Sequence, residues 1–322
     1  MNEILKKLSE VGIVPVIKID DVEKAVPLAN ALIAGGLPCA EITFRTAQGE
    51  EAIRRITAEC PDVLVGAGTV LTTEQVDRAI AAGAKFIVSP GLNPKVVAYC
   101  VEKGIPITPG CSNPSDVEVA LELGLDVVKF FPAEQAGGLA YIKAISAPYP
   151  NLRFMPTGGI NAQNLGSYLA FDKILCCGGS WMVSADLINE GRFDEITVLT
   201  RQAVQTMLGF ELAHIGINAE NAEEAWATAR LFETVFGFAV REGNSSVFAG
   251  SYVEVMKAPY LGKNGHIAIA TNHIARAVAY LEGRGFAFDY STEKKNAKGG
   301  TDAIYMKDEI GGFAVHLLQK KK

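Results

Sequence analysis

The chain has 322 residues, 49% of them hydrophobic, so it can bury a large core and is long enough for two domains. Its formal net charge of −6 and its pI near 5.4 argue against nucleic acid or an anionic membrane as the main partner. The first residues lack the apolar core of a signal peptide and no apolar run is long enough to span a bilayer, so we expect a cytoplasmic protein.

Up to about residue 209, short apolar segments alternate with amphipathic ones. The expected strands are residues 13–19, 39–44, 63–68, 86–89, 105–108, 126–131, 153–157 and 174–178. The helical patterns between them include residues 22–34, 47–59, 73–82, 94–103 and 115–123, and several are followed by glycine, the usual helix stop. This repetition predicts an α/β fold of the (β/α)8 TIM-barrel type, with an open doubly wound sheet as the alternative.

The second expected strand places three polar side chains together. If the strand continues through Arg45, its period of two puts Glu41, Thr43 and Arg45 on one face. In a barrel interior, Glu41 is placed to move protons and Arg45 to clamp a carboxylate with its planar guanidinium. The alternative is a structural ion pair between Glu41 and Arg45 at a strand end.

A single lysine, Lys129, lies near the end of the apolar run from Leu125 to Pro132 and alternates with Val127 and Phe131 at the strand period. Burial disfavours the ammonium form and lowers the pKa of a lysine, which prepares the amine to attack a ketone and form a Schiff base. The alternative is a lysine whose ammonium reaches solvent at a strand end.

Glycine-rich loops follow most of the expected strands, at the ends where barrel enzymes build their sites. The last two loops contain Gly158-Gly159 and Gly178-Gly179-Ser180. Because glycine lets backbone N–H groups approach an anion, these loops predict a phosphate site with the Ser180 hydroxyl as an added donor.

Together these segments resemble the family of 2-keto-3-deoxy-6-phosphogluconate (KDPG) and 4-hydroxy-2-oxoglutarate (KHG) aldolases, from about residue 3 to residue 209. The motifs that carry the resemblance are Val14-Pro15-Val16-Ile17, Glu41-Ile42-Thr43-Phe44-Arg45-Thr46, Gly66-Ala67-Gly68-Thr69-Val70-Leu71, Lys129-Phe130-Phe131-Pro132-Ala133-Glu134, Pro156-Thr157-Gly158-Gly159-Ile160 and Gly178-Gly179-Ser180-Trp181. The resemblance implies a class I aldolase that needs no metal or other cofactor and works as a homotrimer.

The resemblance also implies roles for individual residues. Lys129 takes the Schiff-base position, Glu41 carries protons, and Arg45 and Thr69 take the pyruvate carboxylate end. The other implied substrate-binding residues are Pro90, Phe131, Thr157, Gly158, Gly159, Gly179 and Ser180.

The implied reaction cleaves KDPG to pyruvate and glyceraldehyde 3-phosphate, a step of the Entner–Doudoroff pathway, and also KHG to pyruvate and glyoxylate. Thr157 favours KDPG, while the galactonate-derived epimer and oxaloacetate decarboxylation stay open. The competing interpretation is a non-catalytic or isomerase-like phosphate-binding barrel, with activity or ligand binding in the remainder of the chain.

From about Glu211 the barrel pattern stops and an internal repeat begins. His214-Ile215-Gly216-Ile217 is echoed by His266-Ile267-Ala268-Ile269, and Gly237-Phe238-Ala239-Val240 by Gly285-Phe286-Ala287-Phe288. We therefore expect a barrel domain over 1–209 and a smaller α+β domain over 211–322. The repeat resembles the paired βαβββ modules of the glyoxalase, or vicinal oxygen chelate, superfamily.

That second resemblance implies four metal ligands, His214, Glu254, His266 and His316, although a carboxylate is commoner where His316 stands. Such a set suits zinc, nickel, manganese or iron. The alternative is a module that has lost its metal. The role of this domain stays open among a second enzyme, a ligand-binding regulatory module and a structural appendage.

Overall fold

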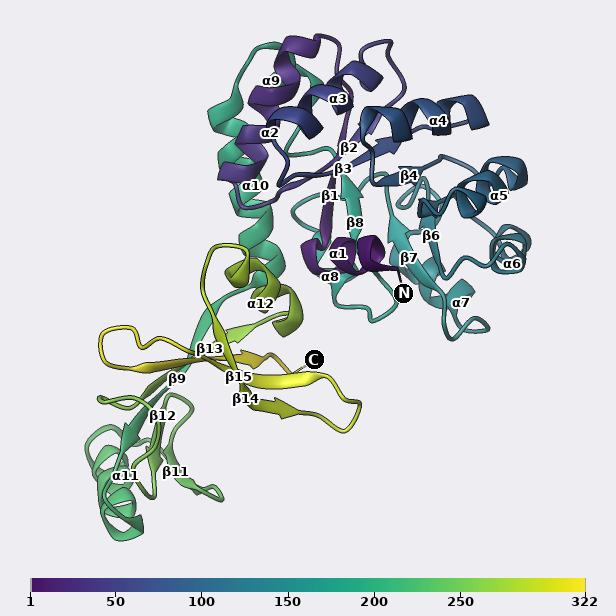
Figure 1. Ribbon diagram of the computed structural model, residues 1–322. Coiled ribbons are helices and arrows are strands. Elements are labelled where there is room, and N and C mark those ends of the chain that lie inside the picture. Colours follow the sequence, from purple (N-terminus) through teal and green to yellow (C-terminus); the bar gives the residue numbers. More distant parts are fainter. Residues whose placement is uncertain (1, 322) are drawn as a thin grey trace. The chain divides into compact units, whose positions relative to one another are not determined.

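The computed structural model describes residues 2–321, and strands alternate with helices throughout its first unit, which ends at Met207 (Figure 1). The strands of this unit are β1 (Ile13–Ile17), β2 (Cys39–Thr43), β3 (Leu64–Gly68), β4 (Phe86–Val88), β5 (Ile107–Thr108), β6 (Val127–Phe130), β7 (Arg153–Pro156) and β8 (Cys177–Gly179). The helices are α1 (Glu3–Val11), η1 (Val22–Lys24), α2 (Ala25–Ala34), α3 (Gly49–Glu59), α4 (Thr73–Ala82), α5 (Pro94–Glu102), α6 (Pro114–Glu122), α7 (Gly138–Ser146), α8 (Leu165–Leu169), α9 (Ala185–Asn189) and α10 (Phe193–Leu208).

All strand pairs in this unit are parallel, and the pairing runs around a closed ring. One sheet has the order β5-β4-β3-β2-β1-β8, and β6 pairs with β7. Isolated parallel bridges join Gly110 to Lys129, Phe154 to Ile174 and Thr157 to Gly178, which connects β6 and β7 to their neighbours. The parallel α/β barrel is confirmed, and the open doubly wound sheet is wrong, because these bridges together with the β1–β8 pair leave none of the eight described strands at an open edge.

Local sequence sets the helix ends. Helix α4 begins after Thr72, whose side chain accepts a hydrogen bond from the backbone N–H of Gln75, and it ends at Gly83 with φ +103°. A hydroxyl N-cap and a left-handed glycine C-cap satisfy backbone groups that the helix leaves free. Both signals are local, so the predicted range of this helix matches the structure.

The core of the barrel joins strand side chains to the first helix. Leu5 and Leu8 of α1 pack in one cluster with buried residues of five strands, namely Val14, Cys39, Phe86, Val88, Val127 and Met155, and with Leu175 and Cys176 before β8. Burial of this apolar surface stabilises the barrel and anchors α1 against the strands.

Several strands are shorter than expected: β1 ends at Ile17 rather than at residue 19, and β5 covers Ile107–Thr108 rather than 105–108. Two further differences concern β2 and β8. Strand β2 ends at Thr43, and residues from Phe44 to Thr46 form a turn, so Arg45 is not a strand residue. The Thr46 hydroxyl donates to the carbonyl of Ile19, a contact between distant segments that the local pattern does not reveal. The last strand lies at Cys177–Gly179 rather than at 174–178.

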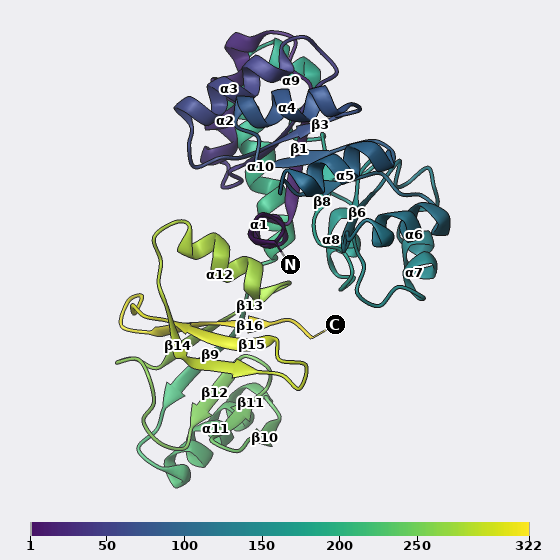
Figure 2. The same cartoon turned by 45° about the vertical axis from the view of Figure 1, so that its right-hand side comes forward.

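The second unit, which begins at Leu208, contains one eight-stranded sheet with the order β10-β11-β12-β9-β13-β16-β15-β14. Its elements are β9 (Glu211–Asn218), α11 (Ala222–Phe236), β10 (Val240–Glu242), β11 (Ser246–Ala249), β12 (Val253–Met256), β13 (His266–Thr271), α12 (Ile274–Glu282), β14 (Phe288–Lys295), β15 (Thr301–Met306) and β16 (Ala314–Gln319). Helix α11 lies against β11 and β12, and α12 lies against β15 and β16 (Figure 2).

The two halves of this sheet repeat one another. Each half has the order strand, helix and three strands, and the halves meet at the antiparallel pair of β9 and β13. The register also repeats, because Glu254 of β12 faces Gly216 of β9 while His316 of β16 faces Ala268 of β13. Among residues 2–321, no helix has the length and apolar character needed to cross a membrane.

Candidate active site and candidate metal centre

A lysine and a glutamate meet inside the barrel. Lys129 lies on β6 and Glu41 on β2, and these strands stand on opposite sides of the ring. The side chains are only 7% and 1% exposed, and Lys129 Nζ lies 3.7 Å from Glu41 Oε1. The Lys129 ammonium therefore does not extend into solvent, and each buried charge has the other as its partner.

Backbone hydrogen bonds fix the lysine in place. The Lys129 N–H donates to the carbonyl of Pro109 at 2.9 Å, and the Lys129 carbonyl accepts from the N–H of Cys111 at 2.8 Å. Lys129 Nζ also lies 5.2 Å from the ring centroid of Phe131, the residue after β6. The aromatic face lets the site hold a cation without further acidic groups.

The two carboxylate oxygens of Glu41 have different surroundings. Among the described residues, Glu41 Oε2 has no hydrogen-bond partner, although it is fully buried. Gly68 makes room for this carboxylate, since a Cβ at position 68 would lie 2.2 Å from Glu41 Oε1. A buried carboxylate oxygen without a partner is costly to the folded protein, and a catalytic role is one explanation for such an exception.

Arg45 is linked to the same strand through a threonine. The Thr43 hydroxyl donates to the carbonyl of Ile17 at 2.8 Å and accepts from Arg45 Nε at 3.1 Å. The exposed guanidinium thus lies beside the strand end that carries Glu41, and Glu41 itself faces Lys129. The alternative interpretation of this strand, a structural ion pair between Glu41 and Arg45, is wrong, because the turn after Thr43 directs the two side chains differently.

Thr69, directly after β3, has an unusual backbone. Its φ of +58° is the only positive value among the non-glycine residues from 2 to 321. A β-branched residue in this region is strained, and such strain concentrates at functional sites. Half-buried Pro90 follows the neighbouring strand β4, so both residues lie at the same end of the barrel as Arg45.

Two glycine loops meet beyond β7 and β8. Gly158 and Gly159 have φ of +97° and +79°, conformations that suit glycine. Thr157 forms a parallel bridge with Gly178, which brings the first loop beside Gly179 and exposed Ser180. The buried Thr157 hydroxyl oxygen has no hydrogen-bond partner among the described residues.

Glu134 supports the first of these loops, a contact that our sequence reasoning missed. Its N–H donates to the carbonyl of Gly158 at 3.1 Å, and its carboxylate accepts a hydrogen bond from the Tyr168 hydroxyl. A Cβ at Gly159 would lie 2.6 Å from Glu134 Cβ. The sequence held one indication of this role, because Glu134 is the last residue of the motif that begins at Lys129.

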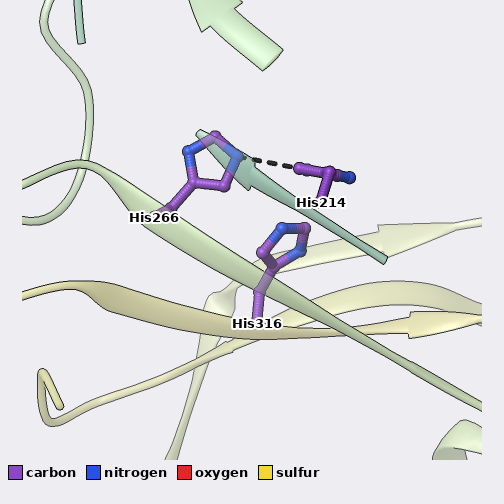
Figure 3. A group of neighbouring side chains, drawn as sticks. All are labelled: His214, His266 and His316. Atoms are coloured by element: carbon purple, nitrogen blue, oxygen red, sulfur yellow. Dashed lines mark hydrogen bonds between the residues drawn. The ribbon is translucent and has the colours of Figure 1, made fainter. Parts of the chain in front are cut away.

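Three histidines converge in the second unit (Figure 3). His214 of β9, His266 of β13 and His316 of β16 each place a ring nitrogen within 4.8 Å of the others. The Nε2 atoms of His214 and His266 are 3.2 Å apart, and Glu254 Oε2 lies 2.9 Å and 3.2 Å from them. The structure therefore brings together all four residues that the second resemblance implies as ligands.

The electrostatics of this cluster favour a neutral imidazole at His316 and an ionised Glu254. Burial, together with His266 and His214, lowers the pKa of His316 to about 3. Burial opposes ionisation of Glu254, but hydrogen bonds from His214, His266 and Ser246 outweigh it and lower the pKa of the carboxyl well below its ordinary value. Neutral imidazole and carboxylate are the forms that bind metal ions.

The first unit is similar to proteins of known family. A family model described as KDPG and KHG aldolase matches residues 4–199. A 2-dehydro-3-deoxy-phosphogluconate aldolase of Treponema pallidum is 53% identical over 205 residues, which cover 64% of this chain and 98% of the relative. The protein of the same name from Haemophilus influenzae is 50% identical over 203 residues, or 63% of this chain and 96% of the relative.

A solved structure shows the same fold. The KDPG aldolase of Legionella pneumophila, with pyruvate captured as a covalent carbinolamine intermediate, is 38% identical with a TM-score of 0.61. The match covers 63% of this chain and 98% of that one.

Proposed function

Because this chain belongs to the KDPG and KHG aldolase family, we propose that its barrel is a class I aldolase that cleaves KDPG to pyruvate and glyceraldehyde 3-phosphate. The observation that carries the proposal is the buried pair of Lys129 and Glu41, with 3.7 Å between Nζ and Oε1. The carbinolamine captured in the Legionella relative supports the same chemistry. KHG, which has the same pyruvate half, is the second substrate.

The reaction begins when a proton leaves the Lys129 ammonium for the Glu41 carboxylate. The neutral amine attacks C2 of the substrate, and Glu41 returns a proton as the carbinolamine loses water and becomes a protonated imine. This cation draws electrons toward C2. Glu41 then takes the proton of the C4 hydroxyl, the C3–C4 bond breaks, and its electron pair forms an enamine at C3. Protonation of C3 and hydrolysis of the imine release pyruvate and regenerate Lys129.

The ends of the substrate are assigned to groups around this pair. Arg45 and Thr69 bind the pyruvate carboxylate, and Pro90 and Phe131 form walls beside Lys129. The glycine loops bind the phosphate with backbone N–H groups and the Ser180 hydroxyl. The Thr157 hydroxyl, which lacks a partner among the described residues, is free to bond the C4 hydroxyl and favours KDPG.

The test is covalent trapping in the full chain. Incubation with pyruvate and borohydride, followed by intact mass and peptide mapping, should place a pyruvate-sized adduct on Lys129. The Lys129→Ala variant should gain no adduct. A labelled Lys129→Ala variant would overturn the lysine assignment, and an unlabelled wild-type protein would favour a phosphate-binding barrel without aldolase activity.

We also propose a homotrimer and a cytoplasmic location, as the sequence resemblance implies. Sedimentation equilibrium of the full chain tests the assembly, since the mass should be three times the 34.3 kDa of one chain. A monomer would contradict the trimer without affecting the lysine chemistry.

For residues 211–322 we propose a glyoxalase-like domain of paired βαβββ modules that binds a divalent metal ion. The ligands would be His214, Glu254, His266 and His316. Metal bonds of about 2.0–2.1 Å place neighbouring ligand atoms about 2.8–3.4 Å apart, from octahedral to tetrahedral geometry. The separations of 2.9–3.2 Å among Glu254 Oε2 and the Nε2 atoms of His214 and His266 lie within this range.

Unpartnered nitrogens also support the metal site. Among the described residues, neither ring nitrogen of His316 has a hydrogen-bond partner, and both are buried. Buried polar atoms without partners are rare unless a ligand satisfies them. A divalent ion there would supply Lewis acidity, and with three neutral imidazoles and one carboxylate it would retain a net positive charge that attracts an anionic oxygen ligand.

Equilibrium dialysis of the metal-stripped full chain against zinc, nickel, manganese or cobalt tests this site. Wild-type protein should bind one ion per chain, and His266→Ala should lose most of that binding. Binding that is unchanged in His266→Ala, or no binding by the wild type, would contradict the proposal.

A further inference from the structure

We propose that Ser246 is a positioning residue that makes Glu254 a ligand through a single oxygen. The proposal rests on the metal site proposed above. It explains why the buried strand β11 carries a hydroxyl next to the carboxylate ligand Glu254.

The hydroxyl and the carboxylate form a direct, shielded contact. Ser246 lies on β11 and is 3% exposed. Its Oγ donates to Glu254 Oε1 at 2.6 Å, while the other carboxylate oxygen, Oε2, faces His214 and His266. The two oxygens of Glu254 are thus divided between the protein and the point where the histidines converge.

The second half of the sheet provides an internal comparison. Ser246 pairs with Met256, two residues beyond Glu254, and in the repeat Ala303 pairs with Leu318, two residues beyond His316. Ala303 therefore occupies the place of Ser246 in the half whose ligand is an imidazole. An imidazole offers one nitrogen to a metal and has no second oxygen to restrain.

The two halves differ in the way that this role requires. In the first half, the Ser246 hydroxyl bonds Glu254, a ligand with a second oxygen that can accept a hydrogen bond. In the second half, the methyl group of Ala303 takes the equivalent place, and the ligand His316 has no second acceptor once one nitrogen binds a metal. A residue that served only for packing would not need a hydrogen-bond donor in a buried strand, where an unpaired hydroxyl is costly. The Ser246 hydroxyl is paired with Glu254 alone in the described contacts.

Restraint of one oxygen has a chemical consequence. With Oε1 held by Ser246, Glu254 contributes one ligand atom, and the four side chains supply four. Without that hydrogen bond the carboxylate can turn and bind through both oxygens, which takes a coordination position that a substrate would use. Residues that orient metal ligands in this way typically contribute about 10-fold to 100-fold in metal affinity.

The experiment measures cobalt and zinc affinity of the metal-stripped full chain by competition with a chromogenic chelator. Ser246→Ala should weaken binding about 10-fold to 100-fold and change the visible spectrum of bound cobalt. Ser246→Thr, which keeps the hydroxyl, should restore both. The matched control is Ala303→Ser, which adds a hydroxyl at the equivalent place in the other half and should leave affinity unchanged.

The outcomes separate this proposal from the metal site itself. If the wild type binds no metal, the proposed site is wrong and Ser246 has no such role. If the wild type binds and Ser246→Ala matches it in affinity and spectrum, only the positioning role is overturned. X-ray absorption of the cobalt-loaded wild type is an independent check, because it does not depend on how a variant folds. Two carboxylate oxygens bound to cobalt would also overturn the positioning role of Ser246.

Discussion

Replacing Gly68 with alanine tests whether the position of Glu41 controls the reaction. A Cβ at position 68 would lie 2.2 Å from Glu41 Oε1 and 2.8 Å from its Cγ, whereas ordinary contacts begin at 3.4 Å. The carboxylate must therefore move by about 1 Å, and a displacement of this size in a catalytic group can cost about 100-fold in rate. Gly68→Ala should lower kcat for KDPG cleavage by about 100-fold, which corresponds to about 2.7 kcal/mol.

The assay is pyruvate release, followed alongside thermal unfolding to confirm that the variant is folded. Gly166→Ala is the matched control, because a Cβ there meets nothing within 4 Å and kcat should not change. In a Glu41→Ala background, Gly68→Ala should have almost no further effect, since no carboxylate remains to be displaced. A folded Gly68→Ala variant with kcat within threefold of the wild type would refute the reasoning.

Three further substitutions address other parts of the site. Lys129→Arg should reduce turnover to background, because guanidinium stays protonated and forms no imine; steady turnover by this variant would contradict the mechanism. Arg45→Lys should raise KM about 10-fold for KDPG and KHG alike, since it removes planar two-point binding of the shared carboxylate, and an effect on one substrate only would argue against that role. Gly159→Ala would be strained at φ +79° and crowded by Glu134, so it should weaken KDPG cleavage but leave cleavage of unphosphorylated KHG unchanged. Equal losses for both substrates would contradict a phosphate site at this loop.

Sequence periodicity predicted the barrel strands well because each strand is defined by a short local pattern. Lys129 lies on β6 as expected, and its burial followed from its apolar neighbours. The end of β2 was missed, because Arg45 continues the polar alternation although the chain turns after Thr43. The Thr46 hydroxyl after that turn donates a hydrogen bond to the carbonyl of Ile19, which lies two residues beyond the end of β1 and is distant in sequence.

Contacts between strands were beyond reach of the sequence alone. The internal repeat made the echo of His214 in His266 visible in the sequence, and the resemblance to the glyoxalase superfamily added Glu254 and His316 to the set of side chains expected to meet. The link from Ser246 to Glu254 depends on the register of β11 against β12, which no local pattern specifies. The need for glycine at position 68 likewise arises only when Glu41 occupies the space beside it.

The placement of Lys129 and Glu41 on opposite strands has a consequence for folding. Neither βα unit alone holds both groups, and the ring must be complete before Nζ and Oε1 come within 3.7 Å. Parallel pairing of distant segments is a late and slow event in folding. Pyruvate trapping during refolding therefore reports the closure of the barrel, because only a closed ring brings Lys129 and Glu41 together. Helix content measured by circular dichroism would not detect this step.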